Sequence, residues 1–580
     1  MKKKTLFRLW KYVYKYKSKM FLALICALIS NVLASLAPLI VGRAIDKVVG
    51  KGNVQFDYVI KILVILGLLY CISAAFMWIF SIFANIVAYS TTYDLRKEAF
   101  YKITKLPLKF FDENAHGDTM SKLTNDIDAV SDGLFQAITQ FYPGIVTILS
   151  SLILMLYLSV KITLVILIMT PFCFIIASYI TKNSNKMFKQ QQNTIGELNG
   201  YIEEIIGNQK VVKAFGYEER SQKQFEKIND KLYGFGQKAQ FYSSLTNPAT
   251  RFVNNITYIL VGIVGGILAV ISGLSVGKIS SFLTYSTQFS QPINNVTSVA
   301  AQLQAALAAA ERIFSILDEN EQTKEALKTE KIQVTEGNVQ FKAVNFSYNE
   351  DRKLIEDLNL KVEKGDTIAI VGPTGAGKTT LVNLIMRFYD INSGSILIDN
   401  KDISHFTRAS VRTSIGMVLQ DTWLFSGTIK DNISYAKPEA TMEEIIAAAK
   451  SANIHSYIKR LPEGYNTIIS EAGGNLSEGQ KQLLTIARVM IKSPPILILD
   501  EATSSVDTRT ETHIQKAFAE IMKNRTTFII AHRLSTIRDA DLILVMNNGN
   551  IVEKGNHKEL IKKDGFYNKL YKSQFENRQI

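Results

Sequence analysis

Nine consecutive residues in the second half of the chain constrain its fold more than any other stretch. The apolar run 367–371 before them predicts a buried strand, and residues 381–385 after them have helical spacing. Glycines between a strand and a helix let backbone N–H groups turn inward toward a polyphosphate, and the helix N-terminus adds a partial positive charge. This order is the phosphate-binding P-loop pattern. The nine residues are Gly372, Pro373, Thr374, Gly375, Ala376, Gly377, Lys378, Thr379 and Thr380.

Side chains in and near this loop supply the chemistry that a bound polyphosphate needs. Lys378 can reach the outer phosphates as a point charge, and Thr379 can place its hydroxyl on Mg²⁺. Further along the chain, the apolar strand 497–499 ends in two acids. We interpret Asp500 as a ligand of the metal and Glu501 as the residue that polarises the attacking water. Adjacent acids also begin many helices, but a P-loop in the same domain favours the catalytic interpretation.

The composition divides the 580-residue chain into an apolar first half and a second half of alternating strands, helices and charges. A net charge of +14 is compatible with nucleic-acid binding, but much of the basic excess adjoins apolar spans. That placement favours a membrane surface and predicts no nucleic-acid partner. The three cysteines lie in apolar runs without ligand spacing, so the sequence supports neither disulfides nor a cysteine metal site.

Uncharged runs of the length that crosses a bilayer, about 20 residues, recur through the first half. Residues 1–19 carry many basic and aromatic residues and no acid, which predicts an interfacial helix. A cleaved signal peptide is the competing interpretation, but the further spans favour a retained first span. The predicted spans are residues 20–42, 62–88, 136–160, 162–181, 252–272 and 279–302.

Two long polar stretches, residues 94–132 and 182–250, join the second span to the third and the fourth to the fifth. Both are rich in Lys and Arg, whereas the short loops on the other side carry few basic residues. The positive-inside rule therefore predicts a multi-pass protein of the plasma membrane with both termini and the P-loop domain in the cytoplasm. High usage of Lys, Asn and Ile is typical of a bacterium with an AT-rich genome.

The sixth predicted span is polar along one face. Its residues 279–310 carry no charge, yet Ser, Thr, Gln and Asn recur at steps of three and four, which places them along one side of a helix. In a bilayer such side chains turn toward protein or a water-filled cavity. Lining a substrate pathway and hydrogen bonding between helices are equal alternatives for them. The residues of this polar stripe are Thr284, Gln288, Gln291, Asn295, Ser298 and Gln302.

Residues 476–480, Leu-Ser-Glu-Gly-Gln, resemble the signature of ATP-binding cassette proteins, and the other motifs of that family are present in its usual order. The resemblance implies that the cofactors are ATP and Mg²⁺ and that the reaction is ATP hydrolysis. Gln420 matches the Q-loop glutamine that reaches metal and water, and His532 matches the switch histidine that contacts the γ-phosphate. The other implied nucleotide contacts are the adenine-stacking Tyr348, the D-loop residue Asp507, and Ser477, Gly479 and Gln480 of the signature.

The first half is similar to the exporter branch of this family, which carries membrane and nucleotide domains on one chain. Residues 110–128 resemble its first intracellular loop, and residues 212–218 resemble the second. The implied fold is an all-α six-helix transmembrane domain over residues 20–318 and an α/β P-loop nucleotide-binding domain with a helical subdomain over residues 337–580. A charged linker, residues 319–336, joins the two domains.

The resemblance also implies a dimer, because the signature of one subunit closes over the P-loop of its partner in this family. The function it implies is ATP-driven export of an amphipathic substrate, such as a drug-like molecule, a lipid or a peptide, by alternating access. A lipid flippase and a non-transporting ATP-gated channel or regulator are the alternatives. Intact Glu501 and His532 argue against a regulator, whereas the sequence barely separates an exporter from a flippase. The implied partners are a second half-transporter subunit, the substrate and membrane lipids.

One residue departs from the family pattern. The third signature position is usually Gly, and here it is Glu478. A carboxylate near the γ-phosphate on the neighbouring subunit repels it or disturbs the backbone contact. The chain's own P-loop, Asp500, Glu501 and His532 match the pattern, which resembles one subunit of a heterodimeric exporter. We therefore favour a heterodimer over a homodimer that tolerates Glu478.

Overall fold

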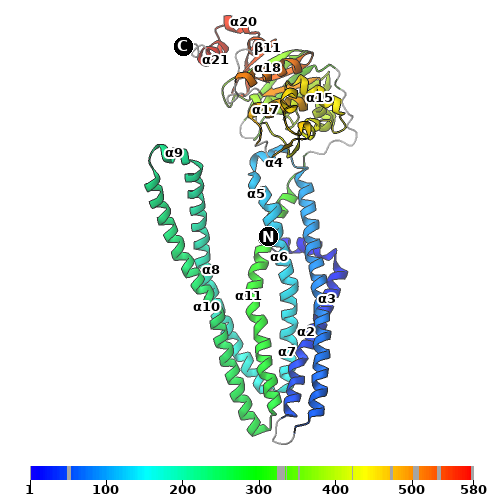
Figure 1. The fold of residues 1–580 in the computed structure, drawn as a ribbon. Coiled ribbons are helices and arrows are strands. Elements are labelled where there is room, and N and C mark those ends of the chain that lie inside the picture. The colour runs from blue at the N-terminus through cyan, green and yellow to red at the C-terminus, as the bar shows by residue number, and fades with distance from the viewer. Residues whose placement is uncertain are drawn as a thin grey trace. The chain divides into compact units, whose positions relative to one another are not determined.

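The computed structural model describes residues 2–48, 54–322, 334, 336–349, 353–420, 422–470, 475–500, 508–531 and 537–575. It divides the chain into two compact units (Figure 1). Unit 1 consists of Met1–Lys105 and Asn114–Glu319, and unit 2 consists of Leu106–Glu113 and Asn320–Ile580. A short segment of the first polar stretch therefore belongs to the second unit.

Unit 1 is helical wherever it is regular, and its helices are long. The apolar runs predict this, because in a bilayer each backbone group must find its partner within the segment. The helices are α1 (Lys2–Tyr14), α2 (Lys17–Asp46), α3 (Phe56–Ile103), α5 (His116–Ser121), η1 (Lys122–Asp126), α6 (Ile127–Gln136), η2 (Ala137–Phe141), α7 (Tyr142–Leu158), α8 (Val160–Gly207), α9 (Gln209–Ala214), α10 (Glu218–Ser272) and α11 (Val276–Asp318), where η1 and η2 are π-helical turns.

Each predicted span lies within these helices, apart from the break at Ser159 between α7 and α8. Within the described residues, four helical stretches are long and apolar enough to cross a membrane: Lys17–Asp46, Phe56–Ile103, His116–Leu158 and Glu218–Ser272. Much of the two polar stretches is helical, because α3, α8 and α10 continue far beyond their apolar parts. These extensions contain few helix-breaking residues, so the helix has no local reason to end at the membrane surface.

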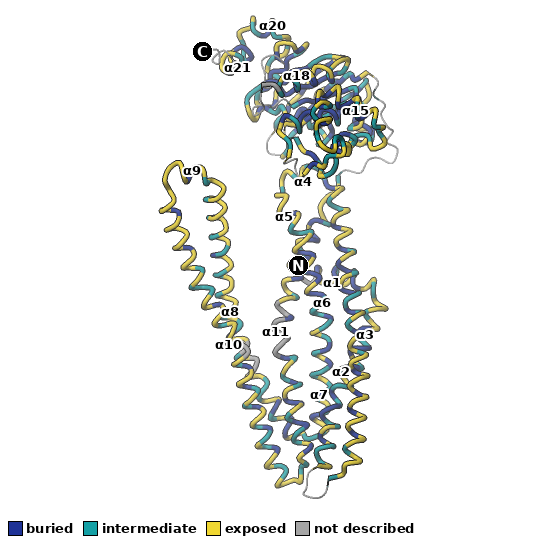
Figure 2. The backbone as a smooth tube through the Cα atoms, in the orientation of Figure 1, coloured by how far each residue is buried: buried dark blue, intermediate teal, exposed yellow. Residues whose placement is uncertain are grey.

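The helices of unit 1 carry both buried and exposed residues along their length (Figure 2), and large apolar side chains occur in both groups. Phe80, Leu95 and Ile127 are buried in a core that α11 closes, and a second core gathers around Phe282 and Tyr285. Many other apolar residues on the same helices are exposed. Exposed apolar surface on long uncharged helices is the pattern that lipid-facing helices show.

The outer ends of α2 and α11 are joined closely. The Asp46 carboxylate accepts hydrogen bonds from the backbone N–H of Gly277 and the hydroxyl of Ser275, both at 2.7 Å. A Cβ added to Gly277 would lie 1.9 Å from the carbonyl oxygen of Gly42, so only glycine permits this approach. The acid at the start of α11 also complements the partial positive charge of that helix terminus.

The described part of unit 2 contains three sheets. A six-stranded sheet has the order β12-β11-β3-β10-β9-β6, with β12 antiparallel to its neighbour and the other pairs parallel. A four-stranded antiparallel sheet has the order β2-β1-β4-β5, and β7 pairs with β8. The strands are β1 (Val339–Phe346), β2 (Ile355–Val362), β3 (Thr367–Val371), β4 (Ser393–Ile398), β5 (Lys401–Asp402), β6 (Ile415–Val418), β7 (Gly427–Thr428), β8 (Ile468–Ile469), β9 (Ile496–Asp500), β10 (Thr526–Ile530), β11 (Leu542–Asn547) and β12 (Asn550–Gly555).

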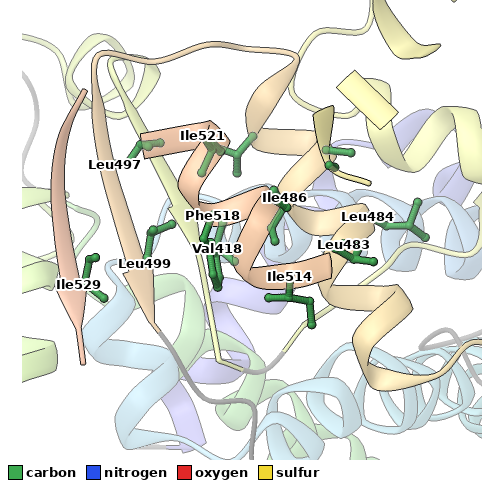
Figure 3. Close-up of a cluster of buried hydrophobic side chains, with 14 of the residues drawn as sticks. Val418, Leu483, Leu484, Ile486, Leu497, Leu499, Ile514, Phe518, Ile521 and Ile529 are labelled. Carbon is green, nitrogen blue, oxygen red and sulfur yellow. The ribbon is translucent and has the colours of Figure 1, made fainter. Parts of the chain in front are cut away.

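Helices cover these sheets and bury two apolar cores. One core joins α17 and α18 to β9 through Leu483, Ile514 and Leu499 (Figure 3), and the other lies between the two larger sheets. The helices of unit 2 are α4 (Leu108–Glu113), α12 (Lys378–Ile385), η3 (Ile403–His405), α13 (Arg408–Thr413), α14 (Ile429–Ser434), α15 (Met442–Ser451), α16 (His455–Ile458), η4 (Gly464–Asn466), α17 (Glu478–Met490), α18 (Thr508–Met522), α20 (His557–Lys562) and α21 (Phe566–Phe575).

Candidate nucleotide-binding site

The glycine-rich loop joins β3 to α12, as the sequence predicts. Gly377 adopts a φ of 94°, and a Cβ there would lie 3.2 Å from the Cα of Gly549. A Cβ on Gly372 would lie 2.3 Å from the carbonyl oxygen of Met546. The loop therefore packs closely against the end of β11 and the turn that follows it. Thr374, Gly375 and Thr379 are exposed on it.

Lys378 is the first residue of α12, and its side chain turns back toward its own loop. The ammonium donates hydrogen bonds to the carbonyl oxygens of Gly372 at 2.8 Å and Pro373 at 3.1 Å. Burial lowers the pKa of Lys378, and the negative charge of Asp500 opposes that effect. The ammonium is thus held at the start of α12, where the helix dipole also favours an anion.

The strand order gathers the predicted catalytic residues at one edge of the six-stranded sheet. β3, β10, β9 and β6 are successive parallel neighbours, so their carboxyl ends share that edge. The P-loop follows β3, Asp500 ends β9, and Gln420 lies two residues after β6 with its side chain exposed. Three predicted residues lie outside the described part of the chain: Glu501, Asp507 and His532.

Tyr348, the predicted adenine-stacking residue, lies beside the P-loop helix. Its hydroxyl is 3.1 Å from the hydroxyl of Thr380, and its ring contacts those of Phe346 and Tyr389 edge to face with centroids 4.9 Å away. These contacts fix the ring next to α12. The structure therefore brings Tyr348 and the P-loop together, two elements that are far apart in the sequence.

Sequence reasoning did not find the contacts that α4 makes within unit 2. The hydroxyl of Tyr389 donates a hydrogen bond to the carboxylate of Asp112, and the ammonium of Lys109 donates one to the carbonyl oxygen of Tyr348 at 3.4 Å. Burial and the bond to Asp112 raise the pKa of Tyr389. A segment of the first intracellular loop thus contacts the residues around the predicted adenine site. The Phe-Phe-Asp motif at 110–112 can be recognised in the sequence. Nothing in the sequence identifies Tyr389 as the residue that Asp112 contacts.

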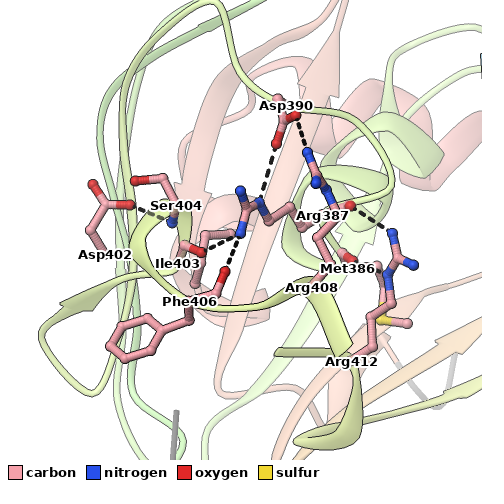
Figure 4. Close-up of polar contacts among 9 residues, drawn as sticks. All are labelled: Met386, Arg387, Asp390, Asp402, Ile403, Ser404, Phe406, Arg408 and Arg412. Carbon is pink, nitrogen blue, oxygen red and sulfur yellow. Dashed lines mark hydrogen bonds and ion pairs between the residues drawn. The ribbon is translucent and has the colours of Figure 1, made fainter. Parts of the chain in front are cut away.

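A second set of contacts that the sequence did not predict holds the chain after α12 (Figure 4). The guanidinium of Arg387 donates to the carbonyl oxygens of Ile403 and Phe406 at 2.8 and 2.6 Å, and Arg408 contacts Asp390 at 2.5 Å. Burial opposes ionisation of Asp390, but Arg408 and Arg387 outweigh it and keep the pKa of that carboxyl below its usual range. Tyr389 lies between Arg387 and Asp390 in the chain, so this network fixes the backbone that carries it.

The signature residues form the start of α17. The hydroxyl of Ser477 accepts from the backbone N–H of Gln480, and the Gln480 side chain accepts from the Ser477 N–H at 2.9 Å. This capping box provides side-chain acceptors for the N–H groups of Ser477 and Gln480 at the start of the helix. The Glu478 carboxylate lies 2.7 Å from the ammonium of Lys481 and 3.4 Å from the hydroxyl of Thr422. The acid is therefore partly turned toward its own subunit.

The six residues of the polar stripe all lie on α11. Thr284, Gln291 and Gln302 are exposed, and the side chains of Asn295 and Ser298 lie outside the description. Gln288 is half-buried, and its amide oxygen is buried without a hydrogen-bond partner among the described residues. Thr284 donates to the carbonyl oxygen of Ser280 within its own helix at 3.2 Å.

The P-loop lies at the carboxyl edge of the parallel strands, and the same chain carries long apolar helices. These two features together define a membrane-bound nucleotide-binding protein. The comparisons narrow this class. The family model of the ABC transporter transmembrane region matches residues 20–293, and the ABC transporter model matches residues 355–504. The chain belongs to the ATP-binding cassette transporters, in the exporter branch with fused membrane and ATP-binding domains.

Known proteins are similar in sequence to most or nearly all of this chain. The uncharacterized ABC transporter ATP-binding protein YfiC of Bacillus subtilis is 41% identical over 99% of this chain and 95% of its own. The fatty acid ABC transporter ATP-binding/permease protein of Mycobacterium tuberculosis is 44% identical over 89% of this chain and 82% of its own. A solved bacterial Atm1-family ABC exporter with ATP bound is 30% identical, with a TM-score of 0.77 over 96% of this chain and 98% of that one.

This membership confirms the predicted family, fold class and enzyme class. The protein is a multi-pass membrane protein with a cytoplasmic nucleotide-binding domain, and it couples ATP hydrolysis to transport.

Proposed function

We propose that this protein exports an amphipathic substrate and that the polar stripe of α11 contributes to the substrate pathway. The observation that carries the proposal is Gln288, whose amide oxygen is buried and unpaired among the described residues. An unsatisfied amide costs about 1–3 kcal/mol, so its retention within a predicted span favours a role with a ligand or water. Thr284, Gln291 and Gln302 extend the same stripe and are exposed.

Fatty acids are the first substrates to test, because one relative of 44% identity is named as a fatty acid transporter. Other relatives are named as multidrug exporters, for example YgaD of Bacillus subtilis at 35% identity. Both kinds of substrate have an apolar body and a polar end, which suits a polar stripe on an apolar helix. A lipid flippase would use the same stripe, and a channel or regulator would hydrolyse ATP without moving a substrate.

The nucleotide residues receive the roles that the family motifs imply. Tyr348 stacks on adenine, the loop 372–380 binds the phosphates, and Lys378 contacts the outer phosphates. The donor set suits Mg²⁺, because hydroxyl, amide and carboxylate oxygens are hard ligands; its ligands are Thr379, Gln420 and Asp500. Glu501 polarises the attacking water and His532 contacts the γ-phosphate. The partner's ATP is covered by Ser477, Gly479, Gln480 and Asp507.

The proposed organisation keeps the boundaries predicted from the sequence. Residues 1–19 lie at the membrane interface, residues 20–318 form the transmembrane domain, and residues 337–580 bind the nucleotide. The linker 319–336 joins the two domains. The long polar stretches 94–132 and 182–250 carry motion between the domains, which the contacts of α4 within unit 2 support.

We further propose that the working unit is a heterodimer. Glu478 is the first residue of α17, and its carboxylate competes with a phosphate for the positive helix terminus. Two like charges 4 Å apart repel by about 4 kcal/mol at an effective dielectric constant of 20. Lys481 offsets only part of this charge because the Glu478 side chain is 57% exposed to water. A second subunit with an unmodified signature would complete the site over this chain's P-loop.

Purification of the chain alone in lipid tests the heterodimer. Native mass spectrometry gives the oligomeric mass, and ATPase activity is compared between the wild type, Glu478→Gln and Glu478→Gly. We expect little activity from the wild type and at least a tenfold increase in Glu478→Gly, with a smaller one in Glu478→Gln. A fully active dimer of identical wild-type chains would contradict the heterodimer.

The substrate class is tested by ATPase stimulation with fatty acids, lipid extract and soluble drugs, using whichever oligomer is active. We expect an amphipathic compound to stimulate the wild type and the response to shift in Gln288→Leu. Stimulation by lipid extract alone would favour the flippase. If Gln288→Leu responds to the same compounds as the wild type, the polar stripe serves helix packing and not substrate binding.

A further inference from the structure

A groove of about 920 Å³ lies on unit 1, outside the nucleotide site and away from the polar stripe. Its described lining residues lie on α1 and the turn after it, and from Asp94 to Thr104 at the end of α3; α1 and α3 lie beside each other in Figure 2. Aromatic and basic side chains are mixed along these walls. Residues that carry the argument are Lys11, Tyr12, Lys15, Lys97, Phe100 and Tyr101.

The helix α1 presents three different faces. Leu9 and Val13 are 2% and 4% exposed and pack into the core of unit 1. A second face carries Phe7, Trp10 and Tyr14, which are 54–75% exposed. The third face is basic and lines the groove. A helix with a buried side, an exposed aromatic side and a cationic side is suited to lie in the membrane interface, with its exposed aromatic residues among lipids.

The groove retains positive charge after its internal pairs are counted. Lys15 is held by the Asp94 carboxylate at 2.6 Å, and the bond to Lys15 lowers the pKa of Asp94. The hydroxyl of Tyr12 donates to the Glu98 carboxylate at 2.7 Å. Arg8, a further wall residue, pairs with Asp318 at the end of α11 at 2.7 Å. Within the described residues, no carboxylate lies within ion-pair distance of Lys11 or Lys97, although Asp94 attracts Lys97 at longer range. Because the Tyr12 hydroxyl is neutral, the Glu98 carboxylate still offsets part of this charge, and the groove walls keep a small excess of positive charge.

The sequence of α3 sets the level of the groove relative to the membrane. Residues 62–93 are uncharged, and Asp94 is the first charged residue after them. Tyr89 and Tyr93, at 65% and 64% exposure, lie one turn apart just before that charge. Tyrosines at the end of an apolar run are typical of the membrane–water interface. The groove therefore begins where the chain leaves the apolar layer on the cytoplasmic side.

We propose that this groove binds the headgroup of an anionic phospholipid from the cytoplasmic leaflet. The phosphate accepts hydrogen bonds from the ammonium groups of Lys11 and Lys97, and the acyl chains lie along the exposed aromatic surface of Tyr93. Charge complementarity selects an anion, and the adjoining apolar surface selects a lipid over a free phosphate. The site is distinct from the transport pathway, since its walls include no residue of α11.

Native mass spectrometry of the full-length purified protein in neutral detergent tests this proposal. Phosphatidylglycerol and phosphatidylcholine are titrated separately, because a neutral micelle removes the general attraction of a charged bilayer. The groove variant is Lys11→Gln/Lys97→Gln. The matched control is Lys4→Gln/Lys19→Gln, which removes the same charge from exposed positions outside the groove.

We expect the wild type and the control to bind one phosphatidylglycerol per chain tightly and phosphatidylcholine weakly. The groove variant should lose at least tenfold in phosphatidylglycerol affinity, since each lost charge-assisted hydrogen bond corresponds to about tenfold or more. The unfolding temperature with added phosphatidylglycerol provides a second readout. It should rise in the wild type and in the control variant but not in the groove variant. Equal phosphatidylglycerol binding by all three proteins would overturn the proposal. Displacement of the lipid by millimolar inorganic phosphate would show that the groove binds free phosphate and would contradict a lipid site.

Discussion

The pair of Arg312 and Asp126 offers a prediction whose size follows from burial. Arg312 on α11 donates to both carboxylate oxygens of Asp126, the last residue of η1, at 2.8 and 2.5 Å. The Asp126 side chain is 10% exposed, whereas that of Arg312 is 53% exposed. Breaking a fully buried pair costs about 3–5 kcal/mol. Because water reaches Arg312, we expect Arg312→Gln to lower the free energy of unfolding by about 2 kcal/mol.

A neighbouring pair provides the control. Arg96 and Asp128 have the same chemistry and a separation of 2.7 Å, but their side chains are 51% and 67% exposed. Exposed pairs contribute about 0.2–1 kcal/mol, so Arg96→Gln should have less than half the effect of Arg312→Gln. On the scale of a 150–250-residue domain, 2 kcal/mol corresponds to a fall of about 4–8 °C in the unfolding temperature.

The assay is thermal unfolding of the purified protein in the same lipid for the wild type, Arg312→Gln, Asp126→Asn and the double variant. The Arg312→Gln loss should shrink by roughly 1 kcal/mol in the Asp126→Asn background, because the stranded carboxylate is then absent. Equal shifts for Arg312→Gln and Arg96→Gln, or full additivity of the two changes at the buried pair, would refute the reasoning from burial.

Three further predictions concern the membrane helices and the ATPase. Gly277→Ala should cost about 1–3 kcal/mol because its Cβ would lie 1.9 Å from a carbonyl oxygen of α2, whereas Gly67→Ala, which meets no atom within 4 Å, should be neutral in the same melting assay. Glu501→Gln should retain ATP binding but slow turnover by at least 100-fold, measured by nucleotide binding and phosphate release; near-normal turnover would remove Glu501 from its role. Gln288→Leu should leave the unfolding temperature unchanged or raise it, because it removes a buried amide oxygen without a hydrogen-bond partner among the described residues. A clear loss of stability would show that this amide does have a hydrogen-bond partner.

The positions of the P-loop, Asp500 and Gln420 at strand ends could be predicted because each pattern is local in the sequence. The loop between β3 and α12 has its own glycine pattern, Asp500 ends the apolar strand β9, and Gln420 follows the apolar strand β6. Parallel strands then bring their carboxyl ends to one edge, which makes the site a consequence of strand order. Long helices in the first half could be predicted for a similar reason, since a bilayer requires long uncharged runs.

The remaining contacts depend on pairs that no local pattern specifies. Tyr389 and Asp112 are 277 positions apart, and either residue alone resembles an ordinary surface residue. Arg387 and Arg408 are cations that the sequence would assign to the surface, yet both are buried because carbonyl oxygens and Asp390 surround them. The polar composition of residues 182–250 did not indicate how far the helices extend there, yet α8 and α10 continue into this stretch, where few residues break a helix.

Export by this protein can be measured as ATP-driven transport into inside-out vesicles. The active oligomer is reconstituted, a fluorescent fatty acid is added outside with ATP, and its accumulation inside is compared for the wild type and Lys378→Ala. Lys378 is chosen because its ammonium lies at the start of the P-loop helix. We expect accumulation by the wild type with ATP and none by Lys378→Ala. ATP hydrolysis without accumulation of any amphipathic compound would contradict export and point to a channel or regulator.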